Sequence, residues 1–362
     1  MKPSYSIAVL PGDGIGREVM AAALAVLHAL GSRCGRSFAT VEHPAGAQHY
    51  LDSGESLPEA TLAACRAADA ILFGAMGLPH VRGADGTEII PQLDIRFALD
   101  LYAGVRPIRC FAGLPGPLAS PRAAEIDLVL VRENTEGLFH ARGRGRLEGS
   151  GPDEAAYDTM KITRHGTARI CDFAFGLAEQ RKAQGKSARV TNVDKANVFA
   201  SMAFWRQVFE ESARAHPAIE TENAYVDAMA LNLVIKPWAY DVLVTENMFG
   251  DILSDLIAAL AGGMGMAPSA DIGDRHALFQ PAHGTAPDIA GQGIANPTAM
   301  VLSVAMMLDW LAVRDGDAAL ADGARAIENA LSTAFDAGTV RPREFGGTSG
   351  TADIVRAVIE GL

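Results

Sequence analysis

The sequence predicts an α/β fold with a largely parallel central sheet. Short β-rich apolar runs alternate with longer stretches of helical pattern, which is typical of parallel strands joined by helices. A length of 362 residues is sufficient for two domains of common size. The composition, 49% hydrophobic and 20% charged, is that of a globular protein.

The clearest expected elements follow from this alternation. Expected strands are 7–10, 70–74, 126–131, 189–193 and 242–245. Expected helices are 17–30, 167–184, 200–215, 252–260 and 297–311. Asn296 precedes Pro297 and is the expected cap of the last helix. The turn at 12–16 follows a strand and opens a helix, but its spacing is not G-x-G-x-x-G, so a Rossmann dinucleotide fold is not predicted.

Charge and cysteine content exclude several functions. With 43 acidic and 31 basic side chains the net charge is −12, which argues against a nucleic-acid or anionic-membrane surface. An anionic substrate must then be attracted by a local arginine cluster. Four cysteines without a C-x-x-C motif predict reduced thiols. The apolar run 299–313 contains Asp309 and is shorter than the ~20 residues that span a bilayer, so a cytoplasmic protein is expected.

The segment HARGRGRLEGSGPD, residues 140–153, departs from the α/β rhythm. It is glycine-rich, polar and long for a simple connection. It is either a flexible surface loop or a β-arm that exchanges with a second subunit.

Carboxylates supply the strongest chemical signal. Asp251 and Asp255 are four residues apart, which places them on one helical face, where like charges repel unless a cation lies between them. Oxygen ligands of this kind suit Mg²⁺ or Mn²⁺. Asp227 is surrounded by apolar residues, and Lys195 follows an expected strand. The alternative is a solvated acidic face with ordinary salt bridges.

Two further groups are candidates for binding. Arg96, Arg106 and Arg132 could together hold a di- or tricarboxylate, although each alone suits a surface ion pair. The loop from His283 to Asp288 could wrap a nucleotide, with Asp288 accepting from ribose hydroxyls and so favouring NAD over NADP. An ordinary turn is the alternative.

These motifs together resemble the β-decarboxylating dehydrogenases, the family of isopropylmalate, isocitrate, homoisocitrate and tartrate/D-malate dehydrogenases. The segments that carry the resemblance are LPGDGIG (10–16), VRENTEG (131–137), VDKAN (193–197), YVDAM (225–229), FGDILSDL (249–256), HGTAPDIAG (283–291) and ANPTA (295–299). They occur in order over residues 7–351, nearly the whole chain.

The resemblance implies a two-domain fold that is distinct from the Rossmann fold. A large cofactor-binding domain would comprise 1–101 and 254–362, and a small dimerisation and substrate domain would comprise 102–253, with an arm at about 138–165. In the implied homodimer, Asp251 and Asp255 share Mg²⁺ or Mn²⁺ with Asp227 of the second subunit, which also lends Lys195, so each active site is shared.

The resemblance also implies an NAD- and metal-dependent oxidative decarboxylation of a (2R)-2-hydroxy diacid. Lys195 and Asp227 would be catalytic, and Arg96, Arg106, Arg132, Gln92 and Leu93 would bind substrate. The implied NAD contacts are Ile15, Asn197, His283, Gly284, Thr285, Ala286, Asp288 and Asn296.

Substrate choice depends on the segment before Arg96. Ile90 and Gln92 stand where isocitrate enzymes tend to have serine and asparagine, and Ile89, Ile90 and Leu93 could line a pocket for an isopropyl group. A 3-isopropylmalate dehydrogenase-like enzyme is therefore expected. The motif VRENTEG makes D-malate or tartrate the next most favoured substrate, and homoisocitrate is a less favoured alternative.

Two departures from the family pattern matter. Phe139 stands where relatives usually have a tyrosine that protonates the enol, and His140 beside it should point the other way if the segment is extended. Gln280 replaces a glutamate, which should change the charge near the cofactor. These departures motivate the alternative of a catalytically silent regulatory homologue.

Overall fold

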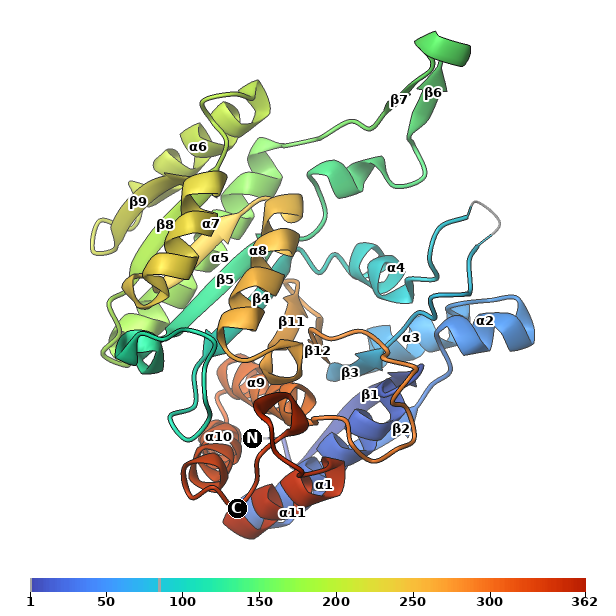
Figure 1. Cartoon of the computed structure of the whole chain (residues 1–362), viewed down its shortest axis with the longest axis vertical. Coiled ribbons are helices and arrows are strands. Elements are labelled where there is room, and N and C mark those ends of the chain that lie inside the picture. The colour runs from blue at the N-terminus through green and yellow to red at the C-terminus, as the bar shows by residue number, and fades with distance from the viewer. Residues whose placement is uncertain (1, 84–85) are drawn as a thin grey trace. The chain divides into compact units, whose positions relative to one another are not determined.

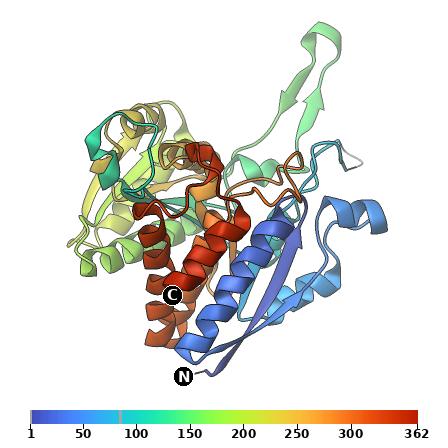
Figure 2. The same ribbon diagram turned by 60° about the horizontal axis from the view of Figure 1, so that its bottom comes forward.

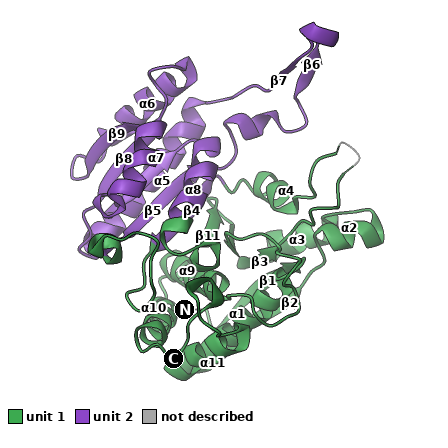
Figure 3. Cartoon of the chain, in the orientation of Figure 1, with its two compact units in different colours: residues 1–101, 109–124, 258–362 green, residues 102–108, 125–257 purple. Residues whose placement is uncertain are grey.

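The structure is a computed structural model that describes residues 2–83 and 86–362. The chain divides into two compact units (Figure 3). Unit 1 comprises residues 1–101, 109–124 and 258–362, and unit 2 comprises 102–108 and 125–257. The expected division after residue 101 coincides with the first unit boundary. Two differences follow from packing: the helix that contains residue 254 continues to Leu260, and residues 109–124 return to unit 1, where Phe111 packs edge-on against Phe335.

Unit 1 contains five neighbouring strands of mostly parallel direction. Their order is β2 (Ser37–Glu42), β1 (Ser4–Gly12), β3 (Ala70–Ala75), β12 (Ala277–Pro281) and β11 (Pro268–Ile272). Strands β2, β1, β3 and β12 pair in parallel, and β11 pairs antiparallel with β12. The helices of this unit (Figure 1) are α1 (Gly16–Cys34), α2 (Ala47–Ser53), α3 (Glu59–Ala67), α4 (Pro91–Ala98), α9 (Thr298–Asp315), α10 (Ala318–Asp336) and α11 (Thr351–Gly361).

Helix α9 is the apolar run noted in the sequence. It packs against β11, β12, α1 and α10, so it is buried on almost every side, which explains why it lacks a polar face. Among the described residues, no helix is long and apolar enough to cross a membrane. The helix begins at Thr298, one residue after the expected start, and Asn296 Oδ1 accepts a hydrogen bond from the Thr298 amide at 3.0 Å, as expected of a cap.

Unit 2 contains five more strands, in the order β4 (Ala103–Arg109), β5 (Asp127–Glu133), β10 (Val242–Thr245), β8 (Arg189–Asp194) and β9 (Glu220–Tyr225). The last four pair in parallel. Its helices are α5 (Arg164–Ala183), α6 (Ala200–Ala213), α7 (Val226–Ile235) and α8 (Asn247–Leu260). Most of the five expected strands and five expected helices differ from the observed ones by a few residues at their ends.

The expected arm is an exposed two-stranded ribbon of unit 2. Strands β6 (Arg146–Glu148) and β7 (Ala155–Tyr157) pair antiparallel, and the ribbon extends away from the rest of its unit (Figures 1 and 2). Leu147, in the middle of β6, is 73% exposed. A two-stranded ribbon is marginal by itself in water, so its exchange with a second subunit stays a prediction.

Candidate active site

Parallel strands of unit 2 bring three sequence motifs to one edge of their sheet. Lys195 directly follows β8, Asp227 lies in the first turn of α7 after β9, and α8 follows β10. The register aligns Thr245 with both Arg132 on β5 and Val193 on β8, so these strands end at the same level. The carboxyl edge of a parallel sheet is where α/β proteins bind ligands.

Lys195 and Asp227 contact each other in this chain. The Lys195 ammonium donates a hydrogen bond to Asp227 Oδ1 at 2.5 Å, and this bond holds the pKa of Asp227 below its usual range. The preceding Asp194 is fully buried and accepts from Nε and Nη2 of Arg206 at 2.8 and 2.7 Å. Arg206 also stacks on Tyr225, at 5.0 Å. It therefore ties the end of β8 to the start of α7.

Asp251 and Asp255 lie one turn apart on α8, as expected, and both are exposed. The pKa of Asp255 is raised, first by partial burial and second by the negative charge of Asp251. Within residues 2–83 and 86–362, no three acidic, histidine or cysteine side chains of a single chain are grouped to hold a metal ion. Asp227 is thus not brought to Asp251 and Asp255 within one chain.

Arg132 is the arginine nearest the paired carboxylates. Its Nε and Nη2 donate to Asn247 Oδ1 at 2.9 and 2.7 Å, and its Nη1 forms an ion pair with Asp251. Gly250 makes room for it, because a Cβ there would lie 2.6 Å from Arg132 Cγ. The side chain is buried and fixed in orientation. Arg106, on β4, is also buried.

Phe139 packs under this arginine, with its ring 5.0 Å from the Arg132 guanidinium carbon. The segment is a short 3-10 helix, Leu138–Ala141, so the alternation of side chains along an extended segment does not place His140 here. His140 points to Arg144, whose Nη1 lies 2.8 Å from His140 Nε2, and burial and the charge of Arg144 lower the pKa of His140. His140 is therefore engaged elsewhere.

In unit 1, helix α4 presents an unusual buried arginine. Arg96 is 4% exposed and donates from Nη2 to Asp271 Oδ2 at 3.1 Å. Among the described residues its Nε and Nη1 have no hydrogen-bond partner, and neither does the buried Oε1 of Gln92, one turn earlier. Leaving a buried polar group unsatisfied costs about 1–3 kcal/mol. This helical face therefore offers two donors and one acceptor to a ligand.

The expected cofactor loop lies against the first glycine-rich turn, also in unit 1. The Ile15 amide donates to Thr285 O at 2.8 Å, and a Cβ on Gly14 would lie 2.0 Å from that same oxygen. Ala286 has a φ of 35°, a left-handed conformation that costs free energy in residues other than glycine. The two segments implied to bind NAD are thus packed together.

The individual side chains of this loop differ in accessibility. Gly284 and Asp288 are exposed, and so is Asn197 in unit 2. His283 Nδ1 lies 2.9 Å from Gly284 O, and burial lowers the pKa of the ring. Asn296 is buried and donates to Glu344 at 2.9 Å, so its amide is already engaged inside unit 1.

Two acidic residues that sequence reasoning missed organise these segments. Asp13 accepts hydrogen bonds from the amides of Ala47, Gln48 and Gly77 at 2.7 to 2.9 Å and so holds the start of α2. Glu246 accepts from the amides of the two residues that begin α8 after Asn247, and burial raises its pKa. For Glu246 the available signal was an acidic residue directly before a helix, whereas the amides that Asp13 binds begin 34 residues further along the chain, where no local pattern could indicate them.

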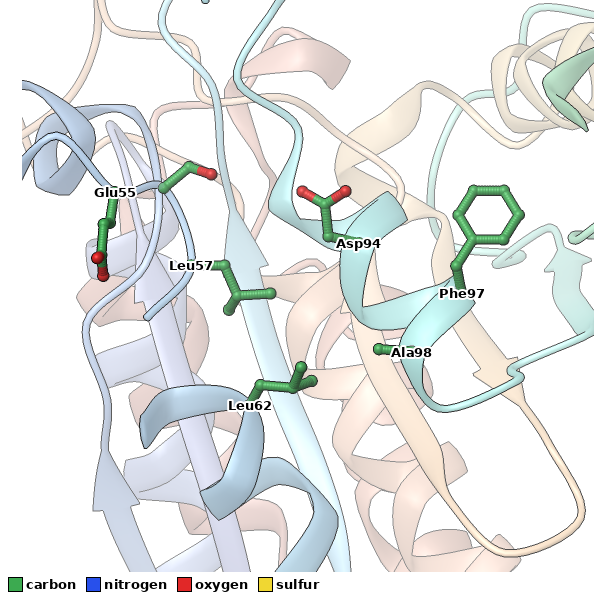
Figure 4. Close-up of a pocket in the computed structure, with 7 residues that line it drawn as sticks. Glu55, Leu57, Leu62, Asp94, Phe97 and Ala98 are labelled. Atoms are coloured by element: carbon green, nitrogen blue, oxygen red, sulfur yellow. The ribbon is translucent and has the colours of Figure 1, made fainter. Parts of the chain in front are cut away.

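A pocket of about 640 Å³ lies on another side of α4 (Figure 4). Asp94, Phe97 and Ala98 line it, opposite Leu57 and Leu62. Helical spacing puts these α4 residues on a different face from Gln92 and Arg96. The pocket therefore contains none of the expected site residues.

Fold and side chains define a class of protein: an α/β protein with buried arginines and with two carboxylates paired on one helical face. Comparison with known proteins gives the family. A sequence profile described as isocitrate/isopropylmalate dehydrogenase matches residues 6–358. The chain belongs to this family.

Individual relatives agree with this assignment. The chain is 44% identical to the 3-isopropylmalate dehydrogenase of Aquifex aeolicus, with 84% of each chain covered. It is 41% identical to the enzyme of that name from Pseudoalteromonas translucida, over 99% of this chain and 98% of the other. Isocitrate dehydrogenase from Methylococcus capsulatus aligns with a TM-score of 0.85 and 37% identity over 99% of both chains. The expected fold and enzyme class, a decarboxylating dehydrogenase acting on a CH–OH group, are confirmed.

Proposed function

We propose that this chain is an NAD- and divalent-metal-dependent dehydrogenase that oxidises and decarboxylates 3-isopropylmalate. The observation that carries the proposal is the buried face of α4. Unpartnered nitrogens of Arg96 can donate to a carboxylate, and unpartnered Gln92 Oε1 can accept from a hydroxyl. A 2-hydroxy acid carries both groups. The names of the relatives support the same substrate class.

The substituent on C3 would be recognised by apolar residues on and before α4. Leu93 is buried and Ile90 is half-buried. Ile89 packs with Ala47 and Val81 in a small core cluster of unit 1, so it is occupied in the fold. Ile90 and Leu93 are therefore the candidates for contact with an isopropyl group. Arg96, Arg106 and Arg132 would bind the carboxylates.

The carboxylates of α8 fit Mg²⁺ or Mn²⁺ in donor type and charge. Asp251 and Asp255 are exposed oxygen donors. Partial burial and then the charge of Asp251 raise the pKa of Asp255, and a cation would relieve the repulsion between the two carboxylates. Asp227 from a second copy would supply the third carboxylate. When bound, the cation supplies polarisation of the adjacent hydroxyl and carbonyl oxygens.

The protein's own groups then handle the proton and the carboxylates. Lys195, in its neutral amine form, would take the hydroxyl proton as the C2 hydride is transferred to NAD, leaving a 2-oxo acid, and Asp227, hydrogen-bonded to it, would complete the proton relay. The carboxylate β to the new carbonyl leaves as CO₂, and C3 must then gain a proton. Arginine contacts hold that carboxylate in position for departure.

NAD would lie against the packed turn and loop of unit 1. Ile15, His283, Gly284, Thr285 and Ala286 belong to these segments, and Asn197 and Asn296 are the remaining proposed contacts. Asp288 is exposed and free to accept from ribose hydroxyls, whereas its charge would repel a 2′-phosphate.

A homodimer with shared active sites is the proposed assembly. On α7, Leu231 and Ile235 are 61% and 58% exposed, and on α8 Ile252 is 60% exposed. Apolar exposure of this kind on the helices that carry Asp227 and Asp251 suits a subunit interface. We place the enzyme in the cytoplasm; its four cysteines are all free thiols, as a reducing compartment permits.

A substrate panel tests the function. The purified protein with Mn²⁺ is offered 3-isopropylmalate, D-malate, tartrate, isocitrate and homoisocitrate, each with NAD and with NADP, and NADH or NADPH formation is followed. We expect the largest kcat/KM with 3-isopropylmalate and NAD. Preference for D-malate or tartrate would replace the proposed substrate, and failure with every diacid would favour a regulatory homologue.

A further inference from the structure

Gln280 contacts the acid that pairs with Arg96. Asp271 on β11 is fully buried, and its Oδ2 accepts from Arg96 Nη2 at 3.1 Å and from Gln280 Nε2 at 3.1 Å. A carboxylate has no proton to donate, so the amide nitrogen of Gln280 must face it. Sequence reasoning placed the effect of Gln280 near the cofactor, whereas the structure places it one contact from a substrate arginine.

Arg96 and Gln280 thus donate to the same Asp271 oxygen, Oδ2, one through a charged guanidinium and the other through a neutral amide. The carboxylate contacts Arg96 through one hydrogen bond of 3.1 Å. Nε and Nη1 stay without partners among the described residues. A carboxylate at position 280 would add a negative charge beside Asp271 and Arg96 where solvent screening is weak, and so would compete for the charge of Arg96.

We propose that Gln280 is a positioning residue for substrate binding: it satisfies Asp271 with a neutral donor, so that the charge of buried Arg96 stays available to a substrate carboxylate. The inference deepens the proposed function and rests on it. Arg96 touches the substrate, whereas Asp271 and Gln280 act through Arg96.

A charge-swap experiment tests it. At about pH 8.5, Gln280→Glu should raise the KM for the diacid about tenfold or more and leave kcat within about threefold of wild type. The reason is that the contact between Arg96 and the substrate carboxylate is kept from ground state to transition state, so its loss changes KM alone. Gln280→Met, similar in length, removes the amide donor but adds no charge, so it should raise KM clearly less than Gln280→Glu does. Thermal melts show that each variant folds.

The double variant Asp271→Asn/Gln280→Glu restores one carboxylate and one amide with their positions exchanged. We expect its KM to return to within about threefold of wild type. Such a recovery would show strong coupling between positions 271 and 280. Unchanged KM in Gln280→Glu, equal effects of Glu and Met, or a double variant as impaired as the sum of its single variants would overturn the proposal.

Calorimetric titration with succinate separates this inference from the proposed function, because succinate has two carboxylates and no hydroxyl to oxidise. If no diacid is turned over, the proposed function fails, but weaker succinate binding to Gln280→Glu than to wild type still supports the role of Gln280. Equal binding to both, or no binding to wild type, contradicts it.

Discussion

Lys195 donates a hydrogen bond to Asp227 across 2.5 Å, joining the end of β8 to the first turn of α7. The two residues follow neighbouring parallel strands, β8 and β9, and Asp194 and Arg206 fix the backbone beside them. A proton relay needs this kind of fixed donor and acceptor pair.

Replacing the amine of Lys195 should strongly reduce turnover and leave NAD binding unchanged. Lys195→Met removes the proposed proton acceptor, and we expect kcat to fall by about 10²–10⁴-fold. NAD binding, measured by fluorescence titration, should be unchanged and serves as the control. A variant with normal kcat would show that another group accepts the proton.

Sharing of the metal site between subunits can be tested by complementation. Asp227→Asn and Asp251→Asn are each expected to be inactive. In a mixed dimer with Asp227 donated across the interface, one site holds both changes and the other holds neither. Random mixing should therefore restore about a quarter of wild-type activity. No recovery after mixing, with mixed dimers verified by differential tags, would place all three aspartates in one subunit.

Phe139 should slow the protonation that follows CO₂ loss, because its ring stacks on Arg132 and carries no exchangeable proton. We expect rapid-mixing experiments on the wild type to show NADH formation ahead of CO₂ or product release. Phe139→Tyr should shorten the delay between NADH formation and product release. Phe139→Leu, which lacks both the hydroxyl and the ring, should not. Equal and fast rates for both events in the wild type would contradict this role.

A buried ion pair between Arg36 and Asp317 should make part of the free energy of unfolding depend on pH in the acid range. Arg36 donates to Asp317 from Nε at 2.7 Å and from Nη2 at 3.0 Å, and these bonds hold the pKa of Asp317 below its usual range. A lowered pKa stabilises the fold above the unfolded value of about 3.9, and this stabilisation is lost as pH falls through the folded value.

Urea unfolding of Asp317→Asn measures that component. The variant should be less stable than wild type at neutral pH, and the difference should shrink as the pH is lowered below about 4. Asp317 also caps α10, so Asp317→Ala should lose about 1 kcal/mol more than Asp317→Asn, which keeps a capping oxygen. A difference between wild type and Asp317→Asn that is constant with pH would assign the effect to packing.

The sequence predicted those elements whose pattern is strong over several residues. Strand 242–245 was clear because it begins with three consecutive apolar residues, and all four of its residues are buried. Strand β9 was missed because it is a polar edge strand, and β4 was missed because Pro107 and two arginines interrupt it. Short apolar runs identify buried strands far better than edge strands.

Site prediction had a similar limit. Residue types and spacing indicated Asp251 and Asp255, because a helix fixes which residues share a face. No spacing rule could join Arg96 to Asp271 or Gln280, since those contacts depend on how β11 and β12 pack beside α4. For the same reason, the sequence could not show which arginines are buried.

The last prediction concerns Gly250, whose missing side chain admits Arg132. An alanine Cβ would lie 2.6 Å from Arg132 Cγ and 2.7 Å from its Cβ, so the arginine must move and lose its contact with Asn247. Alanine is the better helix former by about 1 kcal/mol, but overpacking costs about 1–3 kcal/mol. Gly250→Ala should therefore lower stability and raise the KM of the diacid.

Gly176→Ala is the matched control, because Gly176 also lies inside a helix, α5, and nothing lies within 4 Å of its added Cβ. It should raise the free energy of unfolding by about 0.5–1 kcal/mol and leave KM unchanged. The comparison isolates contact with Arg132 from helix propensity. If both variants are stabilised and bind the diacid normally, the orientation of Arg132 does not depend on Gly250.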